Sequence, residues 1–275
     1  MGQKHRGSYE KLAIRSPSDP MPQLGRPSMN CPASIAQVAD PVNLLVLTSS
    51  ARRHRALIWR LSQFALVNAI VEDFRPLILH GPSQALIAKR IKDVEERCFP
   101  SPQTTSIPGG ELRFCPWESL RIPAEWVRDA DWIVVYGSSM IREPLLSQIS
   151  PKAVNLHAGW APQYRGSHCN FWALHDGYPE YVGMTIQTLD RDVDAGAIWQ
   201  QVGTQPGADP ILYAMQAVKA GFDVLAQFLA MRWHPAPKAQ DISRLIRYSK
   251  HADYTEGAAH AFVEKYQIEA PPAGG

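Results

Sequence analysis

Runs of apolar residues, separated by short polar stretches, divide the chain from residue 41 onward into strand-like and helix-like segments. The first run, VNLLVLTSS (residues 42–50), predicts a buried strand. ARRHRALIWRLSQF (51–64) predicts a helix, because its apolar positions recur at helical spacing. ALVNAIVE (65–72) predicts a second strand. This βαβ opening is typical of an α/β protein.

The same patterns continue to residue 266 and predict the other elements. Helices are expected over residues 83–98, 142–149, 169–177, 209–231 and 254–266, with N-caps at Ser83, Ser167 and Asp209, and strands over residues 131–139, 152–157, 182–190 and 197–205. Residues 1–40 are rich in Pro, Ser and Gly without periodicity, so we expect a disordered or loosely attached arm. One domain is then expected over residues 41–232, followed by a short C-terminal extension over 233–275.

Composition narrows the class of protein. Hydrophobic residues make up 45% of the chain and charged residues 20%, as in ordinary globular proteins. A net charge of +2 is too small to indicate a nucleic-acid partner. The four cysteines show no C-x-x-C pairing, and no apolar run reaches the roughly 18 residues of a membrane span. We therefore predict a cytoplasmic protein with reduced thiols and no membrane partner, whose oligomeric state the sequence leaves unknown.

A polar pair interrupts the apolar strand over residues 152–157. Asn155 and His157 are two residues apart, so their side chains point to the same side of a strand. Polar groups inside an apolar strand are costly unless something satisfies them. The carboxyl end of a parallel strand, facing the crevice where open α/β sheets bind ligands, is therefore their expected place. This is where we expect the chemistry.

Several other kinds of site are excluded by the sequence. The loop after the first strand, residues 48–55, has no glycine, which disfavours a dinucleotide phosphate loop. Its basic cluster, Arg52 to Arg55, is interpreted as a solvated face or as an anion site for a second substrate. Asp190, Asp192 and Asp194 alternate as in a calcium loop, but Ala195 and Gln201 replace the required glycine and glutamate. No metal site is predicted, and no G-x-S-x-G or H-E-x-x-H motif occurs.

An amide, an imidazole and a carboxylate suit acyl transfer onto an amine. Asn155 can donate to an oxyanion, His157 can polarise it or shuttle a proton, and Asp194 can orient the imidazole or take the proton through water. On chemistry alone, a structural polar cluster is an equal alternative.

Several motifs in order resemble the folate-dependent formyltransferase family, which includes the glycinamide ribonucleotide, methionyl-tRNA and sugar-nucleotide N-formyltransferases. They are Asn155-Leu156-His157, Pro162, Tyr164-Arg165-Gly166, Val182-Gly183-x-Thr185 and Asp194-Ala195-Gly196. The resemblance covers roughly residues 42–230. It implies an open, mostly parallel twisted sheet with flanking helices, related to the Rossmann fold, and places the family's N-x-H pair and D-x-G aspartate at Asn155, His157 and Asp194.

The resemblance also implies 10-formyltetrahydrofolate as co-substrate. In such enzymes the pterin lies against two loops, which correspond here to Ser139, Met140, Ile141 and Arg142 and to Asp190, Arg191, Asp192 and Val193. The acceptor side departs from the family, because His157-Ala158-Gly159-Trp160-Ala161-Pro162 replaces H-P-S-L-L-P and the phosphate loop lacks its glycine. Residues predicted to contact the acceptor are Arg53, His54, Arg55, Trp160, Tyr164, Arg165, His168 and Asn170.

The sequence thus predicts a formyltransferase that acts on an amine or hydroxylamine of a small molecule. Two alternatives stay open: a hydrolase of the same fold that releases formate from the donor, and a non-catalytic folate- or nucleotide-binding module. The basic domain that usually follows the catalytic domain in methionyl-tRNA formyltransferases is not expected in the short C-terminal tail. No feature identifies the acceptor.

Overall fold

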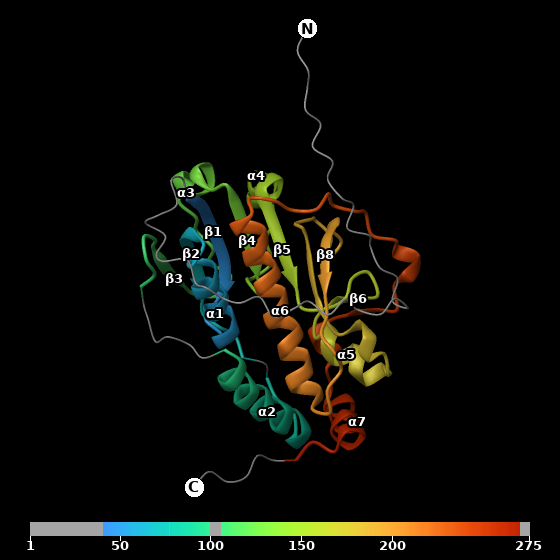
Figure 1. Cartoon of the computed structure of the whole chain (residues 1–275). Helices are drawn as coiled ribbons and strands as arrows, with labels where there is room; N and C mark the ends of the chain where they lie inside the picture. The colour runs from blue at the N-terminus through green and yellow to red at the C-terminus, as the bar shows by residue number, and fades with distance from the viewer. Residues whose placement is uncertain (1–40, 77, 100–105, 270–275) are drawn as a thin grey trace. The chain divides into compact units, whose positions relative to one another are not determined.

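Seven strands form one mixed sheet in the order β3-β2-β1-β4-β5-β7-β8 (Figure 1). The computed structural model of the chain describes residues 41–76, 78–99 and 106–269. The parallel strands are β1 (Val42–Ser49), β2 (Ala65–Glu72), β3 (Leu112–Cys115), β4 (Trp132–Tyr136) and β5 (Ala153–His157). β7 (Met184–Thr188) runs antiparallel to β5, and β8 (Ile198–Val202) antiparallel to β7. The predicted open, mostly parallel α/β sheet is confirmed.

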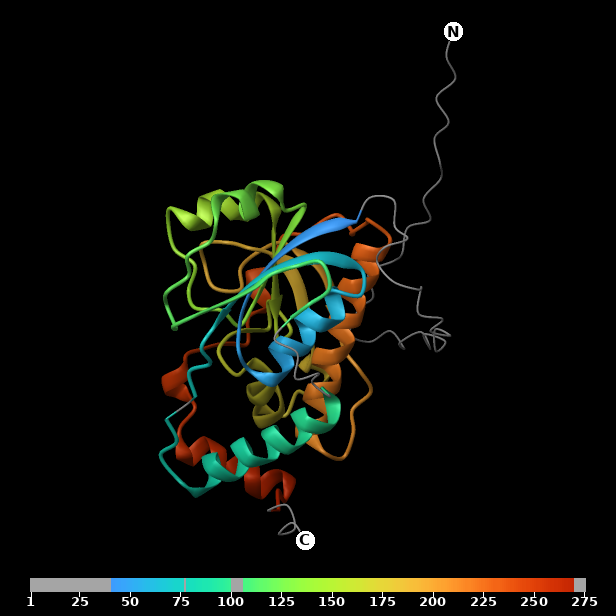
Figure 2. The same ribbon diagram turned by 90° about the vertical axis from the view of Figure 1, so that its left-hand side faces the viewer.

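Helices cover both faces of this sheet, as the edge-on view shows (Figure 2). α1 (Arg52–Leu61) and α6 (Pro210–Ala230) lie on one face, and α3 (Ala124–Asp129) and α4 (Leu145–Ile149) on the other. Alternate residues of β1 point to opposite faces. Leu44 and Val46 accordingly pack with α1 and α6, whereas Leu45 and Leu47 pack with the opposite layer. Burial on both faces explains why β1 is an almost continuous apolar run.

The order of the strands creates a topological switch point between β1 and β4. β2 lies on one side of β1 and β4 on the other, so the chain reverses its direction of travel across the sheet between β1 and β4. Ligands of open α/β sheets bind beyond the carboxyl ends of the strands at such a point. β5 is the next strand after β4 and ends at the same edge. Its polar pair therefore lies one strand away from the switch point.

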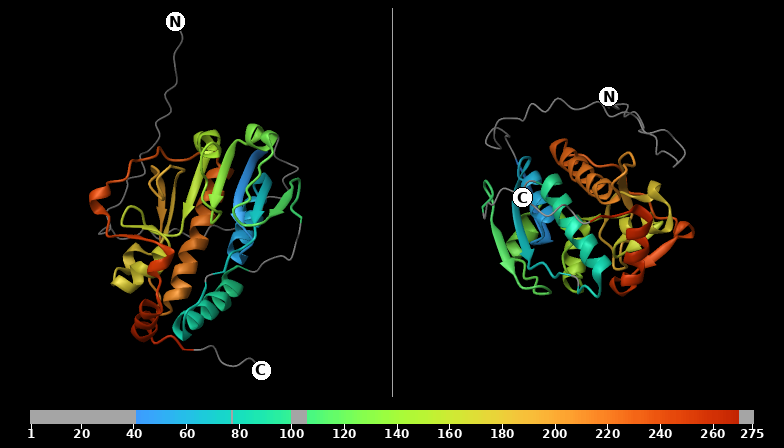
Figure 3. Two further views of the ribbon diagram at one scale, coloured as in Figure 1. Left: turned by 180° about the vertical axis from the view of Figure 1, so that it is seen from behind. Right: turned by 90° about the horizontal axis from the view of Figure 1, so that it is seen from below.

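A second group of helices packs below this edge. α2 (Pro82–Cys98) and α7 (Glu256–Tyr266) lie side by side, close to α5 (Cys169–Asp176) (Figure 3). A small parallel pair, β6 (Tyr164–Gly166) with β9 (Arg247–Ser249), lies in the same region. Four short 3-10 turns complete the described elements: η2 (Ser150–Lys152), η3 (Pro179–Tyr181), η4 (Ile242–Arg244) and η5 (His251–Asp253).

One of the three predicted helix caps is confirmed. Asp209 accepts hydrogen bonds from the backbone of Ile211 and Leu212 at the start of α6. The Ser83 prediction is wrong, because α2 begins at Pro82 and its free N–H groups are instead bound by the Glu256 carboxylate of α7. A cap supplied by a distant element cannot be read from local sequence. The Ser167 prediction is also wrong, since α5 begins at Cys169 with His168 as its N-cap.

Residues 233–269 pack in the same compact unit as the sheet. Lys238 forms a two-way backbone bridge with Ile198 of β8, and β9 pairs with β6. The predicted arm at residues 1–40 lies outside the described residues. Within the described part of the chain, no helix has the length and apolar character that a membrane crossing requires.

Candidate active site

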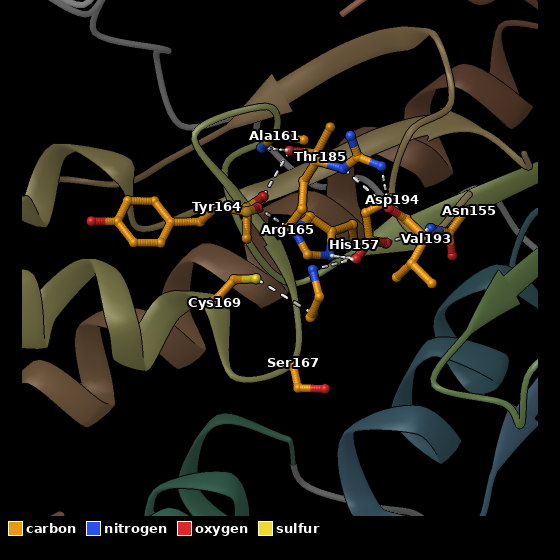
Figure 4. A network of polar contacts seen from close by, with 12 residues as sticks. Asn155, His157, Ala161, Tyr164, Arg165, Ser167, Cys169, Thr185, Val193 and Asp194 are labelled. Atoms are coloured by element: carbon orange, nitrogen blue, oxygen red, sulfur yellow. Dashed lines mark hydrogen bonds and ion pairs between the residues drawn. The ribbon is translucent and has the colours of Figure 1, made fainter. Parts of the chain in front are cut away.

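Asn155, His157 and Asp194 meet at the carboxyl end of β5 (Figure 4). Asp194 lies in the turn between β7 and β8, and its Oδ2 is 3.1 Å from Nδ1 of His157. Its other oxygen, Oδ1, accepts a hydrogen bond of 3.2 Å from Nδ2 of Asn155. β7 runs antiparallel to β5 and ends with Thr188 beside Val154, and the loop that follows β7 carries Asp194 back along β5 to Asn155 and His157. The predicted trio thus forms one contiguous cluster.

Both ring nitrogens of His157 are engaged by the protein. Nε2 is 2.9 Å from the carbonyl oxygen of Tyr164, which can only accept, so Nε2 carries a proton. Nδ1 faces a carboxylate, which favours a second proton there. Burial opposes charge on the ring, but Asp194 and the neighbouring Cys169 raise the pKa of His157 well above its usual value. The geometry therefore favours an imidazolium whose two N–H groups are already donating.

The carboxylate of Asp194 is the counter-ion of this ring. Burial alone would raise its pKa, but His157, the backbone N–H of Gly166 and Asn155 together lower the pKa of Asp194. The Gly166 N–H donates to Oδ2 over 3.0 Å. Every polar group around this carboxylate is thus a donor, which stabilises its charged form.

Asp194 has an unusual backbone conformation. Its φ of +53° lies in the left-handed region, which costs about 1–3 kcal/mol for a residue other than glycine and is common at functional sites. Arg165 of β6 holds the preceding residue, because its guanidinium donates two hydrogen bonds of 3.1 and 2.6 Å to the carbonyl of Val193. Arg165, predicted to contact the acceptor, therefore supports the aspartate turn.

Asn155 is the member of the trio with hydrogen-bonding capacity left. This residue is half-buried, and its side-chain nitrogen donates one hydrogen bond to Asp194. An amide nitrogen carries two hydrogens, so one remains for a ligand, together with the amide oxygen. An oxyanion that develops beside Asn155 can therefore receive this N–H.

The predicted donor loop after β4 lines an open cavity of about 300 Å³. The lining residues are Glu118, Leu120, Ser139, Met140, Ile141, Arg142 and Leu145. Of the four residues predicted there, Ser139 and Ile141 are buried, whereas Met140 is 54% exposed. Four of these residues are apolar and three are polar or charged, so the cavity offers a ligand both kinds of contact.

Glu72, at the end of β2, anchors this loop and was missed by sequence reasoning. Its carboxylate is fully buried and accepts hydrogen bonds from the backbone N–H and the hydroxyl of Ser139, at 2.6 and 2.7 Å. It also accepts the backbone N–H of Glu118 over 2.8 Å. A carboxylate closing an apolar strand is the only local signal of this role.

The second predicted donor loop, residues 190–193, lies beside the first. Arg191 of this loop is 3.4 Å from Glu143, which lies between the cavity-lining residues Arg142 and Leu145. Both side chains are well exposed, so the pair contributes little to stability. It does show that the two loops approach each other, as the folate hypothesis requires.

Side chains of the basic cluster at the start of α1 contact partners within the protein. Arg53 forms an ion pair with Glu95 of α2 and donates to the Tyr136 hydroxyl. His54 is buried, with Nδ1 2.7 Å from the Ser49 hydroxyl, and burial followed by the Arg53 charge lowers its pKa well below the usual value. Arg55 lies on the same helix and is half-buried. An anion site made by Arg53 and His54 would have to compete with these internal partners.

Three further residues predicted to contact the acceptor have internal roles. Tyr164 is fully buried and its hydroxyl donates to Asp176, so it serves His157 through its backbone carbonyl (Figure 4). The Asn170 amide makes two hydrogen bonds with the backbone of Gly183. The Trp160 ring packs over Gly183 and Gly203, where added Cβ atoms would meet it. The structure thus does not bring these three side chains to His157.

His168 differs from these residues because it lies next to a second cavity. Its Nε2 is 3.2 Å from Nδ1 of His251, and its ring stacks on Tyr254. His251 and Tyr254 line an open cavity of about 290 Å³. Burial, followed by the His251 and Arg53 charges, lowers the pKa of His168 to about 4. The ring is therefore neutral at physiological pH.

This low pKa predicts a loss of stability in mild acid. Between its ordinary pKa of 6.5 and about 4, the unfolded state binds a proton at His168 that the folded state does not. Stability from this residue is therefore present above pH 6.5 and is lost as the pH falls toward 4. His168→Asn, which tolerates the positive φ of 58°, should flatten the change in urea midpoint between pH 7 and pH 5. His260→Asn, on the exposed side of α7, is the control, and an equal slope in both variants would contradict the assignment.

The family model that matches this chain covers the segment that carries this cluster. Residues 127–206 match the family model described as Formyl transferase. The methionyl-tRNA formyltransferase of Synechococcus sp. (strain JA-3-3Ab) is 32% identical over 121 residues, which are 42% of this chain and 37% of the relative. The chain spans less than half the length of the curated relatives that it matches.

Solved structures with a similar fold include two formyltransferases. A sugar N-formyltransferase from a Shewanella species superposes with a TM-score of 0.52 at 14% identity, covering 81% of this chain and 87% of that one. A 4-N formyltransferase from Francisella tularensis gives a TM-score of 0.52 at 14% identity, covering 85% of this chain and 91% of that one. At such low identity they show a shared fold. With the match of residues 127–206 to the family model, the predicted resemblance of this chain to the formyltransferase family is confirmed.

Proposed function

We propose that this protein transfers a formyl group from 10-formyltetrahydrofolate to an amine or hydroxylamine of a small molecule. The observation that carries the proposal is the contiguous Asn155–His157–Asp194 cluster at the edge of the sheet, within a formyl transferase segment. The cavity beside Ser139 and Arg142 supports a donor site next to it. The pterin would lie against the apolar side chains there, and the formyl group would reach toward Asn155.

The residues suggest how the reaction proceeds. The acceptor nitrogen attacks the formyl carbon, a new C–N bond forms, and the formyl oxygen becomes an oxyanion. The free N–H of Asn155 donates to this oxyanion, and the nearby positive charge of His157 stabilises it. Breaking the bond between the formyl carbon and the folate nitrogen then releases the product. The amine loses one proton and the leaving folate nitrogen gains one, so the reaction takes up and releases no net proton.

Asp194 has a supporting part in this scheme. Its carboxylate is held by His157, Asn155 and Gly166, and it keeps the imidazole charged and correctly oriented. Its depressed pKa makes it a weak base, so Asp194 stays ionised while the proton passes from the amine through water to the leaving folate nitrogen. A neutral His157 would remove the positive charge from the site.

A mass-spectrometric screen tests the proposed function. The protein is incubated with 10-formyltetrahydrofolate and a panel of amino sugars, amino acids, hydroxylamines and methionyl-tRNA, the last because curated relatives carry that name. We expect one small amine to gain the mass of a formyl group. Formylation of methionyl-tRNA alone would overturn the small-molecule acceptor. Stoichiometric formate from the donor without any amine would instead identify a hydrolase.

A further inference from the structure

Gln240 makes an unusual set of contacts with the turn that carries Asp194. It lies in the segment between α6 and β9, and its Nε2 donates to the backbone carbonyls of Asp194 and Gly196 over 2.7 and 2.8 Å. The same nitrogen is 3.0 Å from Oε1 of Gln187 on β7. An amide nitrogen has two hydrogens, so three oxygens share them. Gln240 thus contacts two carbonyls of the β7–β8 turn and one side chain of β7.

The surroundings fix the orientation of this amide. Backbone carbonyls can only accept, so a reversed amide would place Oε1 against two acceptors. Oxygen and nitrogen of a glutamine side chain are assigned from such contacts. The carbonyls of Asp194 and Gly196 therefore require the side-chain nitrogen of Gln240 to face them, and Gln240 is the donor in both hydrogen bonds.

The segment that carries Gln240 is itself anchored. Lys238 and Ile198 exchange two backbone hydrogen bonds of 2.7 and 2.8 Å, which attach the segment to β8 two residues before Gln240. Further on, β9 pairs with β6, and β6 supplies the Gly166 N–H that binds the Asp194 carboxylate. Gln240 therefore holds the backbone of Asp194, and Gly166 of β6 holds its side chain. The segment 238–249 links the two, because it contains Gln240 and ends in β9, which pairs with β6.

Asp194 needs such support because of its conformation. Its φ of +53° is unfavourable for aspartate, and the carboxylate must still reach both Asn155 and His157. Gly196 follows in the same turn and leaves no room for a side chain, since a Cβ there would collide with the carbonyl of Thr188. A strained turn persists only when its surroundings determine it. The hydrogen bonds that Gln240 donates to the carbonyls of Asp194 and Gly196 supply that constraint.

We propose that Gln240 is a positioning residue for Asp194, which fixes the turn so that one carboxylate meets both Asn155 and His157. The effect of this role on catalysis rests on the proposed function, whereas the contacts of Gln240 are independent of it. Gln240 touches no reacting atom in this scheme and acts through the aspartate. The titratable and charged groups that face His157 are Asp194 from the β7–β8 turn and Cys169 from α5, with Arg165 bound to the adjoining carbonyl of Val193.

The test is an NMR titration of the His157 ring in the whole chain, without donor or acceptor. Gln240→Met removes the donor at similar length. A looser turn would weaken the attraction of Asp194 while burial remains, so the His157 pKa should fall by about one unit or more. Gln200→Met is the matched control, because Gln200 on β8 is exposed and donates to the carbonyl of Gln201. The control should titrate like the unmodified protein.

A second variant separates positioning from general folding. Gln240→Asn keeps an amide but is too short to reach both carbonyls, so it should shift the His157 titration in the same direction. An unchanged titration in both Gln240 variants would overturn the proposal. Loss of folding in both would overturn it too, since Gln240 would then serve the whole fold. Because no substrate is present, the titration gives its answer even if formyl transfer is not found.

Discussion

Replacing Asp194 with asparagine should lower the rate of formyl transfer about 10²- to 10³-fold, the range lost when one electrostatic contribution to oxyanion stabilisation is removed. Its three neighbours, Asn155 Nδ2, His157 Nδ1 and Gly166 N, all donate hydrogen bonds to the carboxylate. An asparagine amide offers one accepting oxygen and turns its own donor toward another donor. The imidazole also loses its counter-ion, so the positive charge beside the oxyanion becomes less stable.

The matched control for this variant is Asp131→Asn. Asp131 accepts the backbone N–H of Asn43 in an exposed position, and an asparagine oxygen can accept the same bond. Rates are measured under single-turnover conditions with the acceptor from the screen, and folding is checked by circular dichroism. A similar rate in both variants would remove Asp194 from the catalytic machinery.

Replacing Glu72 with glutamine should weaken donor binding about tenfold and lower the free energy of unfolding by about 2–3 kcal/mol, the scale of buried hydrogen bonds to a charged group. The buried carboxylate accepts three donors, two from Ser139 and one from Glu118. A glutamine would present its amide hydrogens to at least one of them. The loop that lines the proposed donor cavity would then move away from the end of β2.

Donor affinity is measured by calorimetric titration with 10-formyltetrahydrofolate, and stability by urea unfolding. Glu125→Gln is the control, because Glu125 lies exposed on α3. Reduced stability with unchanged donor affinity would contradict the placement of the donor beside Ser139. Unchanged stability would contradict the hydrogen-bonding role of Glu72.

The parts of the fold that were predictable are those with strong local patterns. The apolar runs of β1, β2, β4 and β5 and the long helix α6 follow from period and composition. The side shared by Asn155 and His157 follows from the pleat of one strand. The short strands β3, β6 and β9 carry too few residues for a period, and their pairing depends on partners elsewhere in the chain.

The parts of the site that were not predictable depend on long-range contacts. Glu72 binds a residue 67 positions away, and Gln240 binds one 46 positions away. Neither belongs to a motif, so only the folded chain reveals them. Tyr164 shows the converse, because a motif residue expected to use its side chain contributes a backbone carbonyl to His157. Sequence motifs identified the position, whereas packing decided which atoms act.

The most direct test of the central claim follows the formyl carbon itself. The protein is mixed with one equivalent of 10-formyltetrahydrofolate labelled with ¹³C in the formyl group and with the acceptor from the screen, and the carbon is traced by NMR in a single turnover. The proposed function predicts that the label appears as an N-formyl group on the acceptor, and that Asp194→Asn greatly slows this appearance. Label found only in formate, or transfer at equal rates in both proteins, would contradict it.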